Sequence, residues 1–155
     1  MLGIDLGTTN SCVSIYTENE MRVLHLEANK DTLPSVVRFV DRKLDNVVVG
    51  TPAKRMMIIK PNEVFASVKS LMRDDKWKED KTVVDKFTID GQVLTPTDVS
   101  SIILKELLRL VKENNEIVIK YSSLLKDKSI YVSIYKDYLP SKEEMLKIIK
   151  KIEKN

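Results

Sequence analysis

The sequence predicts a mixed α/β fold with a smaller α+β insertion, on three observations. Residues 1–33 contain short runs of aliphatic and β-branched residues between polar turns, which is typical of a strand meander. Residues 34–94 mix strand-like and helix-like segments, and residues 95–155 place two amphipathic helical segments around a strand-like run. We therefore expect one domain over residues 1–155, with a core sublobe (1–33 and 95–155) and an inserted sublobe (34–94).

Five strands are expected in the first fifty residues. Strand-like runs occur at 4–6, 13–16, 21–26, 36–40 and 46–49. The first three form a meander, because polar turns separate them. The last two pair across a charged turn, and Gly50 closes that pair. Pro34 ends the loop between the two groups.

The inserted sublobe also contains helical signals. Thr51 can cap a helix and Pro52 suits its first position, so a short helix is expected before Pro61. Apolar residues recur at helical spacing in residues 63–73, which predicts a helix or a helix followed by a turn. A densely charged segment follows at residues 74–81.

A hairpin and a long helix come next. Asp90-Gly91 lies between the strand-like runs 86–89 and 92–94, and this dipeptide is a strong hairpin signal. Thr95 can cap a helix whose first residue is Pro96 and whose first turn carries Asp98. Its expected buried stripe consists of Val99, Ile102, Ile103, Leu107, Leu110 and Val111.

The last part of the chain is expected to return to the core sublobe. Residues 130–135 are strand-like, and Ser141 to Glu144 form a capping box after Pro140. Apolar residues at helical spacing from Met145 to Ile152 predict a last helix.

Composition limits the function classes. The chain is 43% hydrophobic and 32% charged with a net charge of +3, as in soluble globular proteins. Lysines alternate with acids along the whole length, so no clustered basic face for nucleic acid is expected. No secretory signal is visible and no apolar run approaches the ~18 residues of a membrane span, so we expect a cytoplasmic protein without a membrane partner.

Residues 3–11 have the chemistry of a phosphate-binding turn. Gly7 follows a short strand and is expected to take the positive φ that the reversal requires, so that successive N–H groups form an anion site. Thr8 and Thr9 add hydroxyl donors. Asp5 would face the ligand, which suits a hydrated Mg²⁺ between carboxylate and phosphate. The alternative is an ordinary hairpin turn, which Asp, Gly and Thr also favour.

Two further residues could carry chemistry but are expected to be structural. Cys12 is the single cysteine, which excludes an internal disulfide, and we expect a small buried strand residue and not a catalytic thiol. His25 is the single histidine and falls on an alternating strand, where a structural role is expected.

Four ordered motifs resemble the ATPase domain of the seventy-kilodalton heat-shock chaperones, the DnaK-like branch of the actin and sugar-kinase superfamily. Residues 4–13 are similar to the opening signature of that family, and residues 32–37, 49–54 and 67–72 resemble its next three motifs. A sugar kinase would share only the first. The resemblance implies the amino-terminal lobe of a ribonuclease H-like, actin-like ATPase domain.

The resemblance also implies roles for individual residues. Thr8, Thr9 and Asn10, after Gly7, would cradle the β- and γ-phosphates of ATP or ADP, and Asp5 would hold the hydrated Mg²⁺. Lys69 would approach the γ-phosphate as the catalytic lysine, where a compact positive charge offsets developing negative charge. Without the resemblance, Lys69 would be read as a solvated surface residue.

The sequence departs from the family pattern at several positions. Ser70 follows Lys69 where the family usually has a basic residue, and Arg73-Asp74-Asp75 replace a later glycine, so a different loop is expected. Residues 132–136 lack the proline of the family's interdomain-signalling stretch. All four glycines fall in the first lobe, so no second phosphate turn is expected.

Three functions follow from these patterns. The first is a partial ATP-binding domain of a DnaK-like chaperone, unable to hydrolyse ATP alone because half of a two-sided clamp cannot position the nucleotide. Its partners would be nucleotide, cochaperones or a complementary second lobe. The second is a protein-interaction module that self-associates or binds a partner through exposed apolar stripes. The third is a free-standing nucleotide-binding enzyme of another branch of the superfamily, completed by dimerisation.

Overall fold

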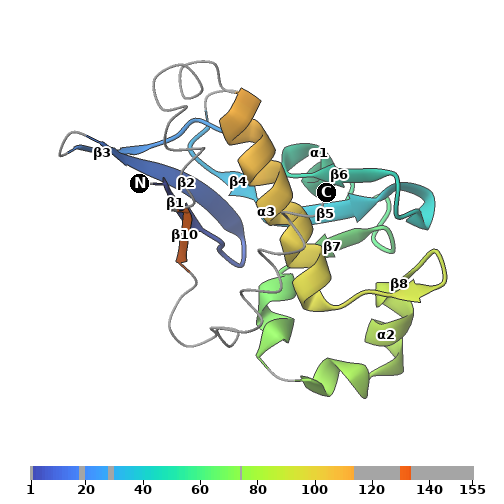
Figure 1. Cartoon of the computed structure of the whole chain (residues 1–155). Helices are drawn as coiled ribbons and strands as arrows, with labels where there is room; N and C mark the ends of the chain where they lie inside the picture. The colour runs from blue at the N-terminus through green and yellow to red at the C-terminus, as the bar shows by residue number, and fades with distance from the viewer. Residues whose placement is uncertain (1, 18–19, 28–29, 74, 114–129, 134–155) are drawn as a thin grey trace.

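Two β-sheets and a long helix that packs against both form the architecture of the chain (Figure 1). The computed structural model describes residues 2–17, 20–27, 30–73, 75–113 and 130–133. The expected mixture of α and β structure is present in this part of the chain.

The first sheet is built around the predicted meander. Strands β1 (Leu2–Asp5), β2 (Asn10–Thr17) and β3 (Glu20–Val23) are antiparallel neighbours, and β10 (Ile130–Ser133) pairs in parallel with β1. The two-residue strand β4 (Leu33–Pro34), which the sequence indicated only as a loop end, pairs with the start of β2.

The second sheet has β5 (Val36–Phe39) at its centre, between β6 (Val47–Val49) and β7 (Val64–Ala66). The expectation of helix over residues 63–73 was wrong for β7, because its backbone pairs antiparallel with β5. A 3₁₀ turn, η1 (Val40–Arg42), follows β5, and α1 (Thr51–Arg55) follows β6. Gly50 and not Thr51 is the N-cap residue of α1.

The segment between the second sheet and the long helix consists of short elements. They are η2 (Val68–Met72), η3 (Asp75–Lys78), α2 (Lys81–Phe87), β8 (Thr88–Ile89) and β9 (Gln92–Val93). The predicted hairpin is confirmed: Asp90 and Gly91 have φ values of 54° and 77°, which a type I′ turn requires. The expected strand at 86–87 was wrong, because both residues end α2.

The long helix α3 (Pro96–Glu113) begins as predicted. The Asp98 N–H donates to Thr95 Oγ1 at 3.1 Å, and the Thr95 N–H donates to Asp98 Oδ2 at 3.0 Å, so the two residues cap the helix reciprocally. Five aliphatic residues of α3 are buried: Val99, Ile103, Leu104, Leu107 and Val111. Ile102 and Leu110 of the expected stripe are partly buried. The apolar face of this helix is therefore covered by the chain itself.

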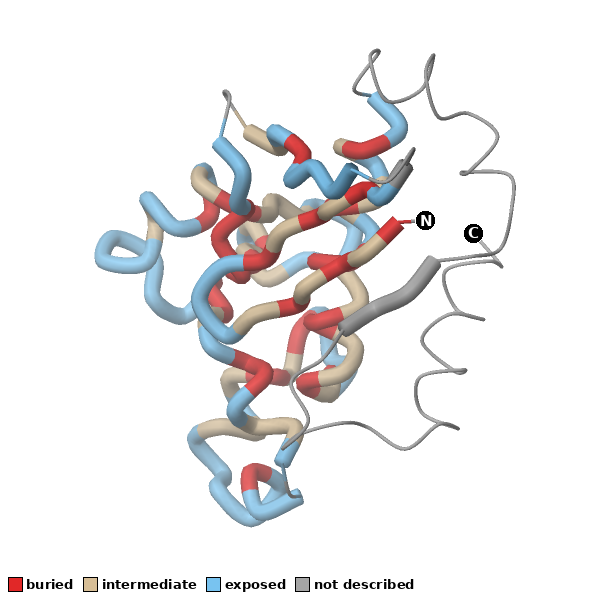
Figure 2. The backbone as a smooth tube through the Cα atoms, turned by 90° about the vertical axis from the view of Figure 1, so that its left-hand side faces the viewer, coloured by how far each residue is buried: buried red, intermediate tan, exposed pale blue. Residues whose placement is uncertain are grey.

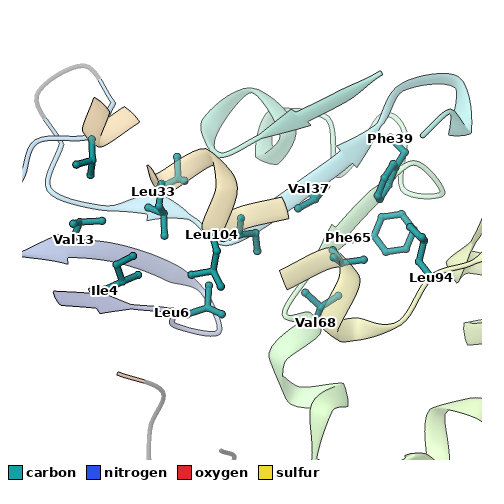
Figure 3. Packing of buried hydrophobic residues seen from close by; sticks show 14 of the residues in the cluster. Ile4, Leu6, Val13, Leu33, Val37, Phe39, Phe65, Val68, Leu94 and Leu104 are labelled. Atoms are coloured by element: carbon teal, nitrogen blue, oxygen red, sulfur yellow. The ribbon is translucent and has the colours of Figure 1, made fainter. Parts of the chain in front are cut away.

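One hydrophobic core joins the two sheets. Figure 3 shows Leu104 of α3 between Leu6 and Leu33 on one side and Val37 on the other. Buried segments lie in the middle of the molecule and exposed loops surround them (Figure 2). Toward α2 the core continues as edge-to-face rings, with Phe39–Phe65 and Phe65–Phe87 centroids 5.3 and 5.0 Å apart. The first sheet is thereby held in a fixed relation to the second.

Three expectations fall outside the described residues. They are the last two residues of the strand predicted over 130–135, the capping box predicted from Ser141 to Glu144, and the helix predicted from Met145 to Ile152.

Candidate functional site

The candidate site is the turn between β1 and β2, residues Leu6 to Thr9, together with the side chains that lie beside it. Gly7 is required there, but not for the predicted reason. Its φ is not positive, and instead a Cβ atom at Gly7 would lie 2.1 Å from the carbonyl oxygen of Asn10. The turn folds back so closely that only a residue without a side chain fits.

Thr8, Thr9 and Asn10 are exposed, so their side chains are accessible at this turn. The backbone behind them is held by the chain. The Ser35 N–H donates to the Thr9 carbonyl at 2.9 Å, immediately after β4 pairs with Asn10 and Ser11. The turn is thus open on one side and supported on the other.

Lys69 comes to this turn from η2, far along the chain. Its side chain is buried, with 7% exposure, and Nζ donates to the Leu6 carbonyl oxygen at 2.9 Å. Ser67, at the N-cap of η2, takes a left-handed conformation with φ 55°, which starts the turn that carries Lys69 inward. Ser70, the departure from the family pattern, is exposed and donates its hydroxyl to Ser67 O at 2.7 Å. The prediction of Lys69 as an ordinary surface residue in the absence of the resemblance was wrong.

Asp5 is the acidic group of the site. It ends β1, opposite Cys12 of β2, and its Oδ1 atom is buried and has no hydrogen-bond partner among the described residues. A buried carboxylate oxygen without a partner is costly unless a cation or water satisfies it. The residue type therefore fits a hydrated cation.

A single carboxylate such as that of Asp5 suits Mg²⁺ better than a metal ion that takes three or more protein ligands. Among the described residues, no group of three or more His, Cys, Asp or Glu side chains is arranged to hold a metal ion. Mg²⁺ keeps several waters and needs only one or two carboxylates. A single carboxylate such as that of Asp5 lies within this range.

Cys12 lies beside this carboxylate and is partly buried, in place of the full burial expected. Burial raises the pKa of the thiol, and the negative charge of Asp5 raises that pKa further. A thiol whose thiolate is disfavoured in this way is a poor nucleophile.

His25 is not part of the site. It lies beyond the end of β3, is exposed, and its Nδ1 is 2.5 Å from Asp31 Oδ1. The expectation that it lies on a strand was therefore wrong.

Two serines that sequence reasoning missed support the turn from behind. The hydroxyl oxygens of Ser11 and Ser35 are 2.9 Å apart, and both residues are buried. In the sequence each of these serines is a small polar residue in an otherwise apolar segment. That pattern is too common to indicate a site.

Two hollows lie away from the turn. One of about 530 Å³ lies between β6 and α3, and one of about 470 Å³ lies beside η1 and residues 59–63. Neither is lined by a residue of the turn. Within the described residues, no helix is both long and apolar enough to cross a membrane.

The comparison with protein families agrees with the motifs. The model of the family described as Hsp70 protein matches residues 1–122, which include β1, β2, Lys69 and α3. This family is one of chaperones that bind nucleotide and Mg²⁺ and work with cochaperones, and membership implies an actin-like ATPase fold. The chain belongs to the Hsp70 protein family.

Proposed function

We propose that the β1–β2 turn and Lys69 form the first half of a nucleotide site, in a partial ATP-binding domain of a DnaK-like chaperone. The observation that carries this proposal is the approach of Lys69 Nζ to within 2.9 Å of the Leu6 carbonyl, at the base of the turn. A positive charge and an exposed row of donors then lie next to each other, as a polyphosphate requires.

The individual roles follow from exposure and chemistry. Thr8, Thr9 and Asn10 are exposed and offer backbone N–H and side-chain donors to the β- and γ-phosphates. Lys69 would bring its ammonium group to the phosphates from beside the Leu6 carbonyl, which its Nζ contacts. Its charge would offset the negative charge of the γ-phosphate.

Mg²⁺ would be held through water by Asp5, whose Oδ1 has no partner among the described residues. When bound, the ion would supply charge neutralisation between the phosphates and this carboxylate. The substrate class is therefore ATP or ADP with Mg²⁺.

Hydrolysis by this chain alone is not part of the proposal. Catalysis of phosphoryl transfer is mostly positioning, and the residues that we assign to the nucleotide all come from β1, the β1–β2 turn, the start of β2 and η2. We keep the division into a core sublobe (1–33 and 95–155) and an inserted sublobe (34–94) as part of this proposal. In its support, β4 of the first sheet ends at Pro34 and β5 of the second begins at Val36.

The direct test is a titration of the isotope-labelled chain with Mg-ATP, followed by amide chemical shifts. The expected result is saturable shifts confined to residues 5–10 and the surroundings of Lys69, with a weak dissociation constant. Lys69→Ala should weaken binding about tenfold or more, the loss expected for one charge-assisted hydrogen bond. Lys105→Ala, an exposed lysine of α3, is the matched control.

Two results would contradict the proposal. If Mg-ATP causes no amide shifts at the turn of the unsubstituted chain, the turn is not a nucleotide site. Steady-state ATP turnover by the unsubstituted chain that is lost in Lys69→Ala would show that the chain hydrolyses ATP alone. That result would favour an enzyme completed by dimerisation.

A protein-interaction module is the second candidate, and a different observation now favours it. Of the two helix stripes that suggested it, the one on α3 is buried or partly buried, and the other lies outside the described residues. Ile58, however, is 94% exposed, and Ile59 and Met57 beside it are also exposed. Exposed apolar groups of this kind mark interaction surfaces. Sedimentation and hydrophobic-dye binding test it: Ile58→Ser with Ile59→Ser should reduce association. A clean monomer that binds no dye would contradict it.

A further inference from the structure

Ser35 lies between strand β4 of the first sheet and strand β5 of the second. Strand β4 ends at Pro34 and β5 begins at Val36, so the chain passes from one sheet to the other at this position. Ser35 is 3% exposed and belongs to neither strand. Its backbone therefore connects the second sheet directly to the strand that pairs beside the turn.

Two hydrogen bonds fix Ser35 against the phosphate turn. Its N–H donates to the Thr9 carbonyl at 2.9 Å, and its hydroxyl lies 2.9 Å from the hydroxyl of Ser11, which is 1% exposed. Both groups are enclosed by protein, so water cannot readily replace either bond.

The bond to Thr9 sets the direction of a donor in the turn. In a planar trans peptide the carbonyl and the following N–H point in opposite directions. Because the Thr9 carbonyl is held toward Ser35, the Asn10 N–H is directed away from Ser35, into the turn. The peptide between them cannot rotate its carbonyl oxygen toward a bound anion without breaking the bond.

Lys69 holds the other flank of the same turn, from the same end of the second sheet. Strands β5 and β7 pair with Val36 opposite Ala66, so Ser35 and the segment leading into Lys69 leave the sheet side by side. Ser35 contacts Thr9 after Gly7, and Lys69 contacts Leu6 before it. Two contacts from one sheet end thus determine the shape of the turn.

We infer that Ser35 is a positioning residue of the phosphate turn, which makes anion affinity depend on the second sheet. This inference rests on the proposed function, because it concerns how well the turn binds phosphate. Ser35 touches no ligand in this account and acts only through Thr9 and Ser11.

The test compares Ser35→Ala, Ser11→Ala and the double variant in the 155-residue chain, with Ser100→Ala as control. Ser100 is equally buried, at 2% exposure, but its hydroxyl contacts Met72 Sδ. The readouts are the dissociation constants for Mg-ATP and for inorganic triphosphate, from amide shifts of residues 7–10, and the free energy of unfolding in urea.

Both single variants should weaken binding of both ligands about fivefold, the value of one hydrogen bond. The double variant should be no weaker than either single one, because both single variants remove the same Ser11–Ser35 hydroxyl contact, whose loss we expect to loosen the Ser35 N–H on the Thr9 carbonyl. Ser100→Ala should lower stability to a similar extent and leave both dissociation constants within twofold. Equal weakening of ATP and triphosphate binding would place the effect at the phosphates.

The outcomes separate the inference from the proposed function. Binding by the unsubstituted chain that is unchanged in Ser35→Ala and Ser11→Ala would overturn the inference alone. Equal loss in Ser100→Ala would also overturn it, because the effect would then follow general stability. If the unsubstituted chain binds neither ligand at the turn, the proposed function fails, and the inference fails with it. Should Ser35→Ala not fold, Ser11→Ala carries the comparison.

Discussion

The ammonium group of Lys69 donates a hydrogen bond to the carbonyl oxygen of Leu6, although the two residues are 63 positions apart in the sequence. Leu6 follows β1 of the first sheet, and Lys69 belongs to η2, which follows β7 of the second. The contact therefore joins the two sheets at the base of the turn, and it is made by a buried lysine. Both the stability of the chain and its affinity for anions should depend on it.

Lys69→Ala should lower the free energy of unfolding by about 2 kcal/mol, because a buried carbonyl loses a charged donor. Urea denaturation followed by circular dichroism measures this. The exposed control Lys105→Ala should change stability by less than about 0.5 kcal/mol. Equal stability of the two variants would contradict the structural importance of the Lys69–Leu6 contact.

Gly7→Ala should destabilise the chain by about 1–3 kcal/mol, as overpacking does, and abolish anion binding. The reason is the 2.1 Å approach of a Cβ atom to Asn10 O, which only a shift of the turn could relieve. Gly91→Ala is the comparison: its site is open but its φ is +77°, so it should cost about 1 kcal/mol and leave binding intact. Normal anion binding by Gly7→Ala would show that binding does not depend on the close approach of Gly7 to Asn10 O.

Arg42→Lys should loosen α2. The guanidinium of Arg42 donates at 2.6–3.1 Å to the backbone carbonyls of Asn62, Asp85, Lys86 and Thr88. A lysine cannot reproduce this fork, so a loss of about 2 kcal/mol is expected. The fluorescence of Trp77, the single tryptophan, reports the change, because its ring lies 5.6 Å from that of Phe87 in α2. Unchanged fluorescence and stability would mean that the four contacts contribute nothing.

Glu63 should make stability depend on acid pH. The hydrogen bond from Arg38 is the main reason that the pKa of Glu63 is lowered, and it is reinforced by the charges of Arg38 and Lys60. A lowered pKa gives stability that is present above the unfolded-state value of about 4.3 and is lost as pH falls through the folded-state value. Glu63→Gln should therefore be less stable than the unsubstituted chain at pH 7. The difference should shrink as the pH is taken below about 4. Parallel pH profiles would contradict the importance of this pair.

Cys12 should respond to the charge on Asp5. Because burial and the Asp5 carboxylate raise the pKa of the thiol, a thiol-specific reagent should react with Cys12 more slowly at pH 8 than with a free cysteine. Asp5→Asn should lower that pKa and speed the reaction, and no other thiol is present to confuse the measurement. Superimposable pH–rate curves for the two proteins would show that the carboxylate does not act on Cys12.

Local signals in the sequence predicted much of this fold. The hairpin turn at Asp90-Gly91 and the helix cap formed by Thr95 with Asp98 were predicted correctly, because the interactions of turns and caps lie within four residues of sequence. Strand β7 was predicted as a helix, because the apolar spacing through Val64 and Val68 also fits a helix. Only the pairing with β5 decides between helix and strand. Helix α2 was missed because its surroundings are charged, although Asp80 caps it by accepting from the Thr82 N–H.

The sequence indicates residue types for the candidate site but not the geometry of those residues. Position in a motif singles out Asp5, Gly7 and Lys69, but the reason Gly7 is needed depends on where Asn10 O lies in space. Likewise, the burial of Lys69 against Leu6 depends on how two sheets pack, and no local pattern encodes it. The support that Ser35 gives to Thr9 is of the same kind.

The most direct test uses Mn²⁺ as a paramagnetic substitute for Mg²⁺ in an ATP complex added to the isotope-labelled chain. The account predicts that Mn-ATP broadens amide signals of residues 5–10 and of Lys69 first, and that Asp5→Asn weakens this broadening while Lys105→Ala does not. Broadening centred on residues away from the turn, or broadening that Asp5→Asn leaves unchanged, would contradict the assignment of this turn as the phosphate and metal site.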